Sequence, residues 1–221
     1  MGEHITLTAS DGAKVGAYKA MPAGKPKGGM IVIQEIFGVN HHIRNVVDQY
    51  AARGYVAIAP ALFDRAEPNV ELGYTPDDIA KAREIRGKVP TDKMLLDVEA
   101  AAKEIGSAGK TGIVGYCLGG TIAYAAAVQI PQISAAVGYY GGGIAAMADQ
   151  KPKAPTMLHF GERDHSIPMS DVEKIRQARP DVPVYVYDAE HGFSCDERKS
   201  FDKASADLAL ERTLKFFDEK L

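Results

Sequence analysis

Gly115-Tyr116-Cys117-Leu118-Gly119-Gly120 is the most informative segment of this chain. The apolar run Thr111 to Val114 precedes it and is typical of a buried strand, and the small, apolar run Thr121 to Gln129 follows it and is typical of a helix. A strand, a tight turn with glycine on both sides of a reactive side chain, and a helix form the setting of a nucleophile elbow. We therefore predict that Cys117, in the pattern Gly-x-Cys-x-Gly, is a nucleophile.

The chemistry of such a turn explains its residue types. Neighbours without a Cβ let the chain reverse closely and expose the central side chain. The N-terminus of the following helix offers unpaired amides and a positive dipole end, which favour a thiolate or an oxyanion forming beside it. The alternative is a small buried cysteine in a glycine-rich turn, since free cysteine is among the most buried residue types.

Short apolar runs alternate with helical patterns on both sides of this segment, which predicts an α/β fold with a mainly parallel central sheet and helices on both faces. We expect one domain over residues 1–221, because the chain has no internal repeat and no linker. The predicted strands are His4–Thr8, Val15–Lys19, Met30–Ile36, Tyr55–Ala59, the strand before Cys117, Ala135–Tyr140, Thr156–Phe160 and Val184–Tyr187. The predicted helices are Asn40–Arg53, Asp77–Lys88, Thr91–Ile105, Thr121–Gln129, Ser170–Arg179 and Phe201–Glu219.

The composition is that of an ordinary globular protein. The net charge is −3, and no basic stripe is present, so we expect no nucleic-acid partner. No apolar run reaches about 18 residues, and the N-terminus has no signal pattern, so we expect no membrane partner. The two cysteines have no zinc spacing and no disulfide framework, which favours a reducing, cytoplasmic location. We also expect a monomer.

Two further chemical groups follow predicted strands. Asp164 lies just beyond one strand and His191 just beyond another. In a parallel sheet the carboxyl ends of the strands meet at one edge, so we expect both to lie near Cys117. The order nucleophile, acid, base is that of α/β hydrolases. In these roles Cys117 attacks a carbonyl, His191 takes and returns the proton, and Asp164 fixes the imidazole tautomer.

Other residues near these positions could fill the same roles. Glu162 and Asp188 are rival acids, and His165 is a rival base. Asp164 can also be a turn-forming aspartate, and His191 a histidine of a surface loop. Three roles in the expected order at three strand ends favour catalysis.

The segment around Cys117 resembles the dienelactone hydrolase family, the carboxymethylenebutenolidases, and the resemblance covers nearly the whole chain. The matching motifs, besides that segment, are Gln34-Glu35-Ile36-Phe37-Gly38-Val39-Asn40, Ala136-Val137-Gly138-Tyr139-Tyr140-Gly141, His191-Gly192-Phe193 and Glu211-Arg212-Thr213. The resemblance implies an α/β-hydrolase fold and cleavage of a small ester or enol lactone through an acyl-cysteine. It implies a triad of Cys117, Asp164 and His191. It also implies an oxyanion hole made of the amides of Leu118 and Ile36.

The resemblance further implies that Glu35 restrains the thiol until substrate binds and then helps to activate it. A carboxylate inside the predicted strand Met30–Ile36 costs several kcal/mol unless it is paired or protonated, which is an independent reason to expect a special role. The alternative is a structural ion pair with an arginine.

Substrate recognition departs from the family pattern. The family is understood to hold the substrate carboxylate with two arginines, and Arg83 is the best match to the first. Cys195 stands where the second is expected, and Arg198 is nearby but out of register. Gly87 replaces a tyrosine of the pattern. Arg83 and Arg198 are therefore the candidate substrate-binding residues.

We expect no metal and no cofactor. His41 and His42 are adjacent, so on a helix they point in different directions and make a poor metal pair. Two other functions stay open: a general carboxylesterase acting on different substrates through the same triad, and a thiol redox sensor or binding module that reuses the fold.

Overall fold

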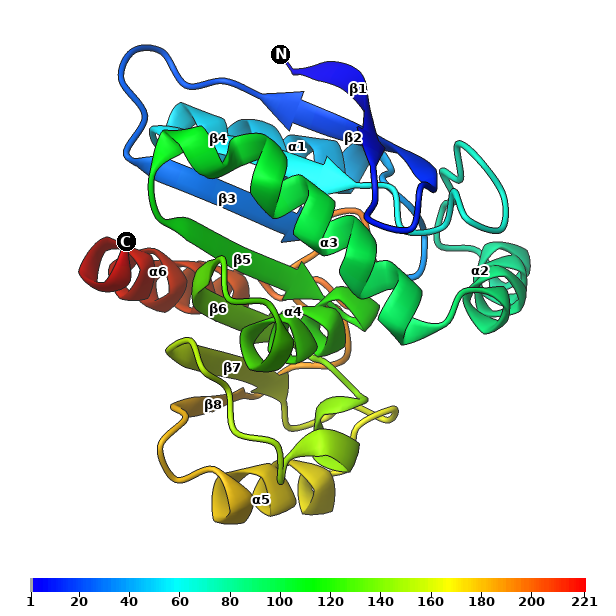
Figure 1. Ribbon diagram of the computed structural model, residues 1–221. Coiled ribbons are helices and arrows are strands. Elements are labelled where there is room, and N and C mark those ends of the chain that lie inside the picture. Colours follow the sequence, from blue (N-terminus) through cyan, green and yellow to red (C-terminus); the bar gives the residue numbers. More distant parts are fainter. Residues whose placement is uncertain (1) are drawn as a thin grey trace.

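The computed structural model describes residues 2–221, and its strands form one eight-stranded sheet with helices packed against it (Figure 1). The order across the sheet is β1-β2-β4-β3-β5-β6-β7-β8. The strand bounds are β1 Glu3–Thr8, β2 Lys14–Ala20, β3 Gly28–Ile33, β4 Tyr55–Pro60, β5 Thr111–Tyr116, β6 Ile133–Tyr139, β7 Thr156–Gly161 and β8 Val184–Tyr187. β1 and β2 form an antiparallel hairpin and β2 runs antiparallel to β4, whereas all other neighbours are parallel. The prediction of a mainly parallel sheet is confirmed.

Residues 2–221 also form six α-helices, five between strands and α6 after β8, and all six were predicted to within a few residues. Their bounds are α1 His41–Ala52, α2 Pro76–Lys88, α3 Thr91–Ile105, α4 Leu118–Gln129, α5 Met169–Ala178 and α6 Lys203–Lys220. Asn40 begins α1 as predicted, because its side chain accepts a hydrogen bond from the amide of Ile43. Among residues 2–221 no helix combines the length and the apolar character needed to cross a membrane.

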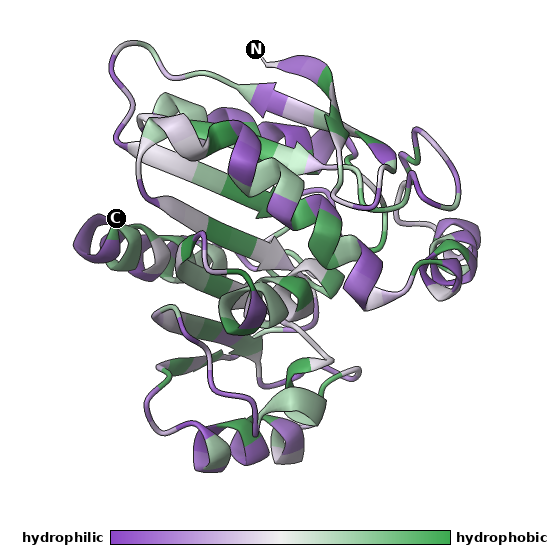
Figure 2. Ribbon diagram, viewed as in Figure 1, coloured by the Kyte–Doolittle hydropathy of each residue, from purple (hydrophilic) through white to green (hydrophobic). Residues whose placement is uncertain are grey.

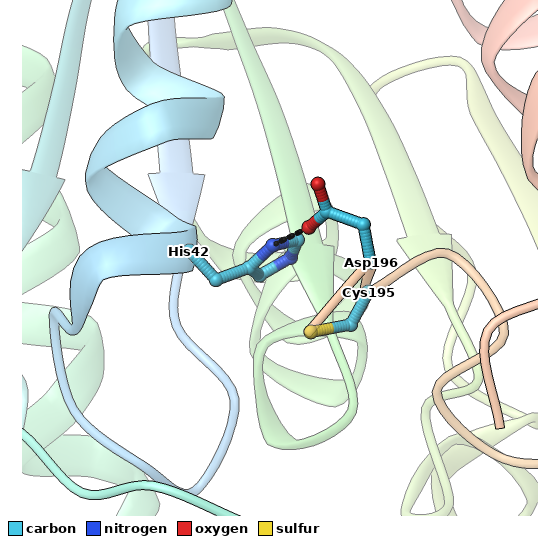
Figure 3. A group of neighbouring side chains, drawn as sticks. All are labelled: His42, Cys195 and Asp196. Carbon is cyan, nitrogen blue, oxygen red and sulfur yellow. Dashed lines mark hydrogen bonds and ion pairs between the residues drawn. The ribbon is translucent and has the colours of Figure 1, made fainter. Parts of the chain in front are cut away.

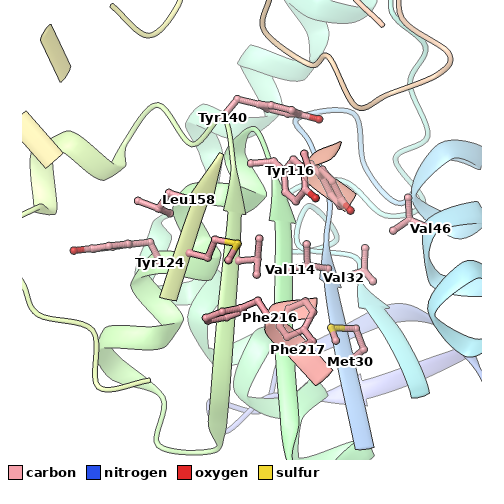
Figure 4. Packing of buried hydrophobic residues seen from close by; sticks show 14 of the residues in the cluster. Met30, Val32, Val46, Val114, Tyr116, Tyr124, Tyr140, Leu158, Phe216 and Phe217 are labelled. Carbon is pink, nitrogen blue, oxygen red and sulfur yellow. The ribbon is translucent and has the colours of Figure 1, made fainter. Parts of the chain in front are cut away.

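The core is divided by the sheet, because successive residues of a strand point to opposite faces. In β3, Met30 and Val32 join the cluster packed against α1 and α6, whereas Ile31 and Ile33 join the cluster packed against α3 and α4. Figure 4 shows Met30 and Val32 in the first cluster together with aromatic side chains of α6. Burial on both faces explains why the central strands are apolar throughout and lie in the green interior of Figure 2.

The structure corrects the predicted strand Met30–Ile36. β3 ends at Ile33, so Glu35 and Ile36 lie in the connection to α1. Just past the strand, Oε1 of Gln34 accepts a hydrogen bond from the backbone of Leu62, and its Nε2 donates to the carbonyl of Glu35. Glu35 is buried and Ile36 is partly buried, so the apolar pattern continued although the ladder has ended.

Candidate active site

Cys117 lies at the turn between β5 and α4 in a strained conformation, with φ 56° and ψ −115°. The glycines on either side are required by sterics. A Cβ on Gly115 would overlap the carbonyl of Gly119, and a Cβ on Gly119 would overlap the carbonyl of Ile33. The Cys117 side chain remains partly exposed at the N-terminus of α4. The turn therefore has the geometry of an elbow.

His191 and Asp164 meet at the same edge of the sheet. The Nδ1 atom of His191 lies 2.7 Å from Oδ2 of Asp164. The other carboxylate oxygen accepts hydrogen bonds from the backbone amides of Ser166 and Ile167, at 2.8 and 3.1 Å. Asp164 is 5% exposed, so these contacts hold it firmly. Because Nδ1 faces Asp164, the other ring nitrogen is left for a different partner.

Cys117 lines the same pocket as His191, and its sulfur is among the causes that shift the pKa of the imidazole. Burial lowers the pKa of His191, but hydrogen bonds with Asp164 and Cys117 outweigh it and raise the pKa to about 10. These contacts favour the protonated form of the imidazole. A protonated imidazole beside the sulfur stabilises negative charge there, which is the electrostatic requirement of a cysteine nucleophile.

The rival acids and base lie apart from this arrangement. Glu162 and His165 are exposed, and in the described part of the chain neither makes a hydrogen bond to His191 or Cys117. Asp188 forms a surface ion pair with Arg163, whose Nε lies 3.0 Å away. The structure thus brings together Cys117, His191 and Asp164 from among the candidates.

Glu35 is 1% exposed and is paired with Arg198. The Nη1 group of Arg198 donates to Oε1 of Glu35 across 2.8 Å, while Oε2 has no hydrogen-bond partner among residues 2–221. The contact to Glu35 is among the causes that raise the pKa of Arg198, against the effect of burial. No hydrogen bond joins Glu35 to Cys117 within the described residues. The Glu35 carboxylate is therefore paired with an arginine through one oxygen, while its other oxygen is unpaired among the described residues.

Arg198 reaches the site although it is out of register with the family pattern. Its guanidinium lies 5.8 Å from the ring centroids of both Phe37 and Tyr74. It also covers Gly192, where a Cβ would overlap the guanidinium. Cys195, in the expected arginine position, is fully buried. A side chain three residues further along the loop thus occupies the space next to Glu35.

A pocket of about 520 Å³ opens above Cys117. Its wall is formed by the elbow, α2, the loops after β6 and β7, and the loop that carries His191 and Arg198. The charged residues that line it are Arg83, Arg86, His191 and Arg198. Arg83 is exposed and pairs with no carboxylate in the part of the chain that the structure describes, whereas Arg86 is held by the carbonyl of Val89. A second cavity, of about 650 Å³ between α6 and the β7–β8 edge, contains none of the candidate residues.

Leu118 and Ile36 line the same pocket. Leu118 is the first residue of α4, so its amide has no acceptor within the helix. Neither amide donates to another group of residues 2–221. Two residues with free backbone amides therefore line the pocket that contains Cys117.

Two contributions to the site were missed by the sequence analysis. The ring of Tyr140 packs against His191 with centroids 5.1 Å apart, and its hydroxyl is 2.7 Å from Oγ of Ser194. The hydroxyl of Ser200 donates to the carbonyl of His191 across 2.7 Å. Tyr140 could have been found from its position at a strand end, whereas Ser200 carries no sequence signal.

The two cysteines are expected to differ sharply in reactivity. The Sγ atom of Cys195 donates to the hydroxyl of Tyr74 at 3.3 Å, and burial together with the charge of Glu35 raises the pKa of Cys195 to about 12. Iodoacetamide should therefore label native protein once, at Cys117, as read by mass spectrometry. Cys117→Ser should remain unlabelled until denaturant exposes Cys195. Labelling of native Cys117→Ser at the rate of the wild-type protein would contradict this assignment.

A mainly parallel sheet with a nucleophile elbow after β5, and an acid and a histidine after later strands, defines an α/β hydrolase. The model of the dienelactone hydrolase family matches residues 15–221. The chain belongs to the dienelactone hydrolase family.

Named relatives agree with this membership. A carboxymethylenebutenolidase of Pseudomonas putida is 34% identical, covering 97% of this chain and 95% of that protein. A Synechocystis protein named "Putative carboxymethylenebutenolidase" is 37% identical, over 87% of this chain and 86% of its own. The crystal structure of a Klebsiella pneumoniae protein, titled a "Putative Dienelactone Hydrolase", superimposes with a TM-score of 0.88 at 32% identity, covering 99% of this chain and 98% of that one. The fold and the general type of hydrolase are thereby established.

Proposed function

We propose that the protein hydrolyses a small, carboxylate-bearing ester or enol lactone of the dienelactone type through an acyl-cysteine intermediate. Its supporting observation is that Cys117 and the Asp164-paired His191 line one pocket together with three arginines. Relatives named carboxymethylenebutenolidase make this substrate class the natural first choice.

In the acylation step Sγ of Cys117 attacks the carbonyl carbon, and the bond to the leaving oxygen breaks. His191 gives its proton to that oxygen, which in a lactone stays tethered to the acyl group. In deacylation His191 accepts a proton from water as the water attacks the thioester, and Cys117 leaves as the thiolate. Asp164 keeps Nδ1 protonated throughout and stabilises the imidazolium that reappears.

The amides of Leu118 and Ile36 supply the oxyanion hole in this proposal. Both are free donors on the pocket wall, and preorganised donors at a developing oxyanion are among the largest contributions to acyl transfer. Because they are backbone groups, they stay in place when side chains change.

Glu35 and Arg198 act together in the proposal. Arg198 holds Glu35 in the resting protein, so an incoming substrate carboxylate competes with Glu35 for the guanidinium. Displacing Arg198 would leave the Glu35 carboxylate buried without the arginine that now pairs with it. Glu35, freed from Arg198, then helps to activate Cys117, which links substrate binding to activation.

A direct assay tests the proposal. Wild-type protein should hydrolyse a dienelactone carrying a free carboxylate much faster than the methyl ester of the same compound. Rapid quenching and mass spectrometry should detect the acyl group on Cys117. No preference for the acid would remove the dienelactone assignment, and full activity in Cys117→Ala would remove the cysteine mechanism.

Arg83→Ala is expected to lower kcat/KM for the carboxylate substrate by about 10- to 100-fold. The reason is that one charge-assisted contact contributes about 1.5–3 kcal/mol, and about 1.4 kcal/mol corresponds to tenfold. The neutral methyl ester should be nearly unaffected. Arg163→Ala, which removes an exposed arginine outside the pocket, is the matched control. Equal losses for both substrates would show that Arg83 has a structural role.

A general carboxylesterase on the same triad is the second candidate. Gly87 and Cys195 depart from the family pattern, and Arg83 is an exposed side chain, which supports a wider substrate range. The same ester pair distinguishes the two. A redox sensor has less support, because it needs neither Asp164 nor His191.

We also propose that the protein is a monomer and is located in the cytoplasm. Both cysteines are free, and the large hydrophobic side chains exposed among residues 2–221 are Met21, Phe201 and Leu208, which offer little apolar area for a second copy. Light scattering during size exclusion tests the oligomeric state.

A further inference from the structure

A histidine, a cysteine and an aspartate from two segments that are far apart in the sequence lie close together (Figure 3). His42 is the second residue of α1, and Cys195 and Asp196 lie on the loop after β8 that also carries His191 and Arg198. One donor atom of each residue lies within 4.8 Å of the other two.

One ring nitrogen of His42 lacks a hydrogen-bond partner among the described residues. It is 5% exposed, and its Nδ1 atom lies 3.2 Å from Oδ1 of Asp196. Its Nε2 atom is buried and has no hydrogen-bond partner among residues 2–221. Buried polar groups are normally paired, so the unpaired ring nitrogen of a histidine that lies in a group with a thiol and a carboxylate needs an explanation.

We propose that His42, Cys195 and Asp196 form a binding site for Zn²⁺ or a similar thiophilic divalent ion. Thiolate, imidazole and carboxylate are the three ligand types that zinc takes in proteins. A thiolate and a carboxylate carry two negative charges, which balance the ion. Mg²⁺ and Ca²⁺ are disfavoured, because they select oxygen ligands.

The distances between the three donor atoms are slightly longer than in a zinc site, and binding of the ion would draw the side chains together. Zinc bonds of about 2.0–2.3 Å in a tetrahedron place ligand atoms about 3.5 Å apart, so the present limit of 4.8 Å requires a contraction of about 1 Å. The Asp196 side chain is 68% exposed and can move inward, whereas His42 and Cys195 are fixed by burial. Three protein ligands leave a fourth position for water or for the Tyr74 hydroxyl, which already contacts Cys195.

The site has its own route to solvent. A cavity of about 190 Å³ is lined by His42 and Asp196 and shares no lining residue with the pocket above Cys117. An ion can therefore enter without passing the nucleophile. Once bound, it would tie the start of α1 to the loop of His191 and Arg198. The proposal revises the expectation from sequence, because the ligand spacing of 154 positions between His42 and Asp196 matches no zinc motif.

Co²⁺ provides the sharpest test, because a thiolate ligand gives it a charge-transfer absorption band that nitrogen and oxygen ligands do not. The metal-free full-length protein should bind one Co²⁺ with this band, and Zn²⁺ should displace it and raise the melting temperature. Cys195→Ser should abolish the band, whereas Cys117→Ser should retain it. His42→Gln should weaken Zn²⁺ binding by at least about 100-fold, since even loss of an outer partner of a metal ligand costs 10- to 100-fold.

His41→Asn is the matched control, since His41 neighbours His42 but pairs with Glu197. It should leave both the band and the affinity unchanged. Circular dichroism checks the folding of each variant, and His42→Gln keeps the test decisive if Cys195→Ser is unstable, because it retains both thiols. Absence of the band in the wild-type protein overturns the proposal. So does a band that survives Cys195→Ser and disappears in Cys117→Ser, which would place the ion at the nucleophile.

Discussion

Replacing His191 by alanine is expected to lower kcat by about 10³-fold or more, while the protein stays folded. His191 is hydrogen-bonded to Asp164 and lies beside Cys117, so in the proposed mechanism its loss removes the proton acceptor, the proton donor and the positive charge beside the sulfur together. Residues that act as one unit lose most of their effect when any member is removed. Steady-state hydrolysis of the preferred ester, corrected for active sites by thiol titration, measures the change.

Asp164→Asn is the companion variant, because it keeps the shape of the side chain. An amide in place of Oδ2 can present an N–H to Nδ1 and so favour the wrong tautomer, and we expect a loss of similar order. Glu162→Gln, on the exposed rival acid, should leave kcat unchanged. Near-normal turnover in His191→Ala or Asp164→Asn would show that the triad is assigned to the wrong residues.

The second large effect concerns stability. Arg198→Ala is expected to destabilise the fold by about 3–5 kcal/mol, because it leaves the carboxylate of Glu35 buried without the arginine that pairs with it. Equilibrium denaturation in urea at neutral pH, with unchanged slope, measures the free energy of unfolding.

Two controls isolate the pair. The double variant Glu35→Gln/Arg198→Ala should recover much of the loss, because no uncompensated charge remains. Arg163→Ala should cost less than about 1 kcal/mol, since its pair with Asp188 is solvent-exposed. If Arg198→Ala were as mild as Arg163→Ala, the Glu35 carboxylate would have another source of compensation.

Local patterns sufficed for most of the fold. The elements were correctly predicted where apolar periodicity and a cap agreed, as in α1 with Asn40 at its start. The prediction was wrong at the end of β3, since Glu35 is as buried as the strand residues and Ile36 is partly buried, although neither belongs to the strand. An apolar run predicts which residues are buried, but it does not predict where the backbone stops pairing with a neighbouring strand.

The site shows the same limit. Cys117, Asp164 and His191 could be located because each follows a strand, and strand ends are readable from sequence. The position of Arg198 could not be settled, because the path of the loop from His191 depends on contacts with Phe37 and Tyr74 that no spacing encodes. The approach of His42 to Cys195 is equally a product of tertiary packing.

Two of the segments that line the pocket, the loop of His191 and Arg198 and helix α2, differ in what they carry, and this difference has an evolutionary consequence. The loop of His191 and Arg198 carries the base and the partner of Glu35, so a change there alters chemistry and recognition together. Helix α2 carries Arg83 but no reacting group, buries only Ala82 and Ile85, and holds its own N-terminus with the Thr75–Asp78 capping box. Its outer face can exchange residues at little cost in stability. We therefore expect substrate preference to diverge among related enzymes through substitutions in α2, while the sequence of the loop changes slowly.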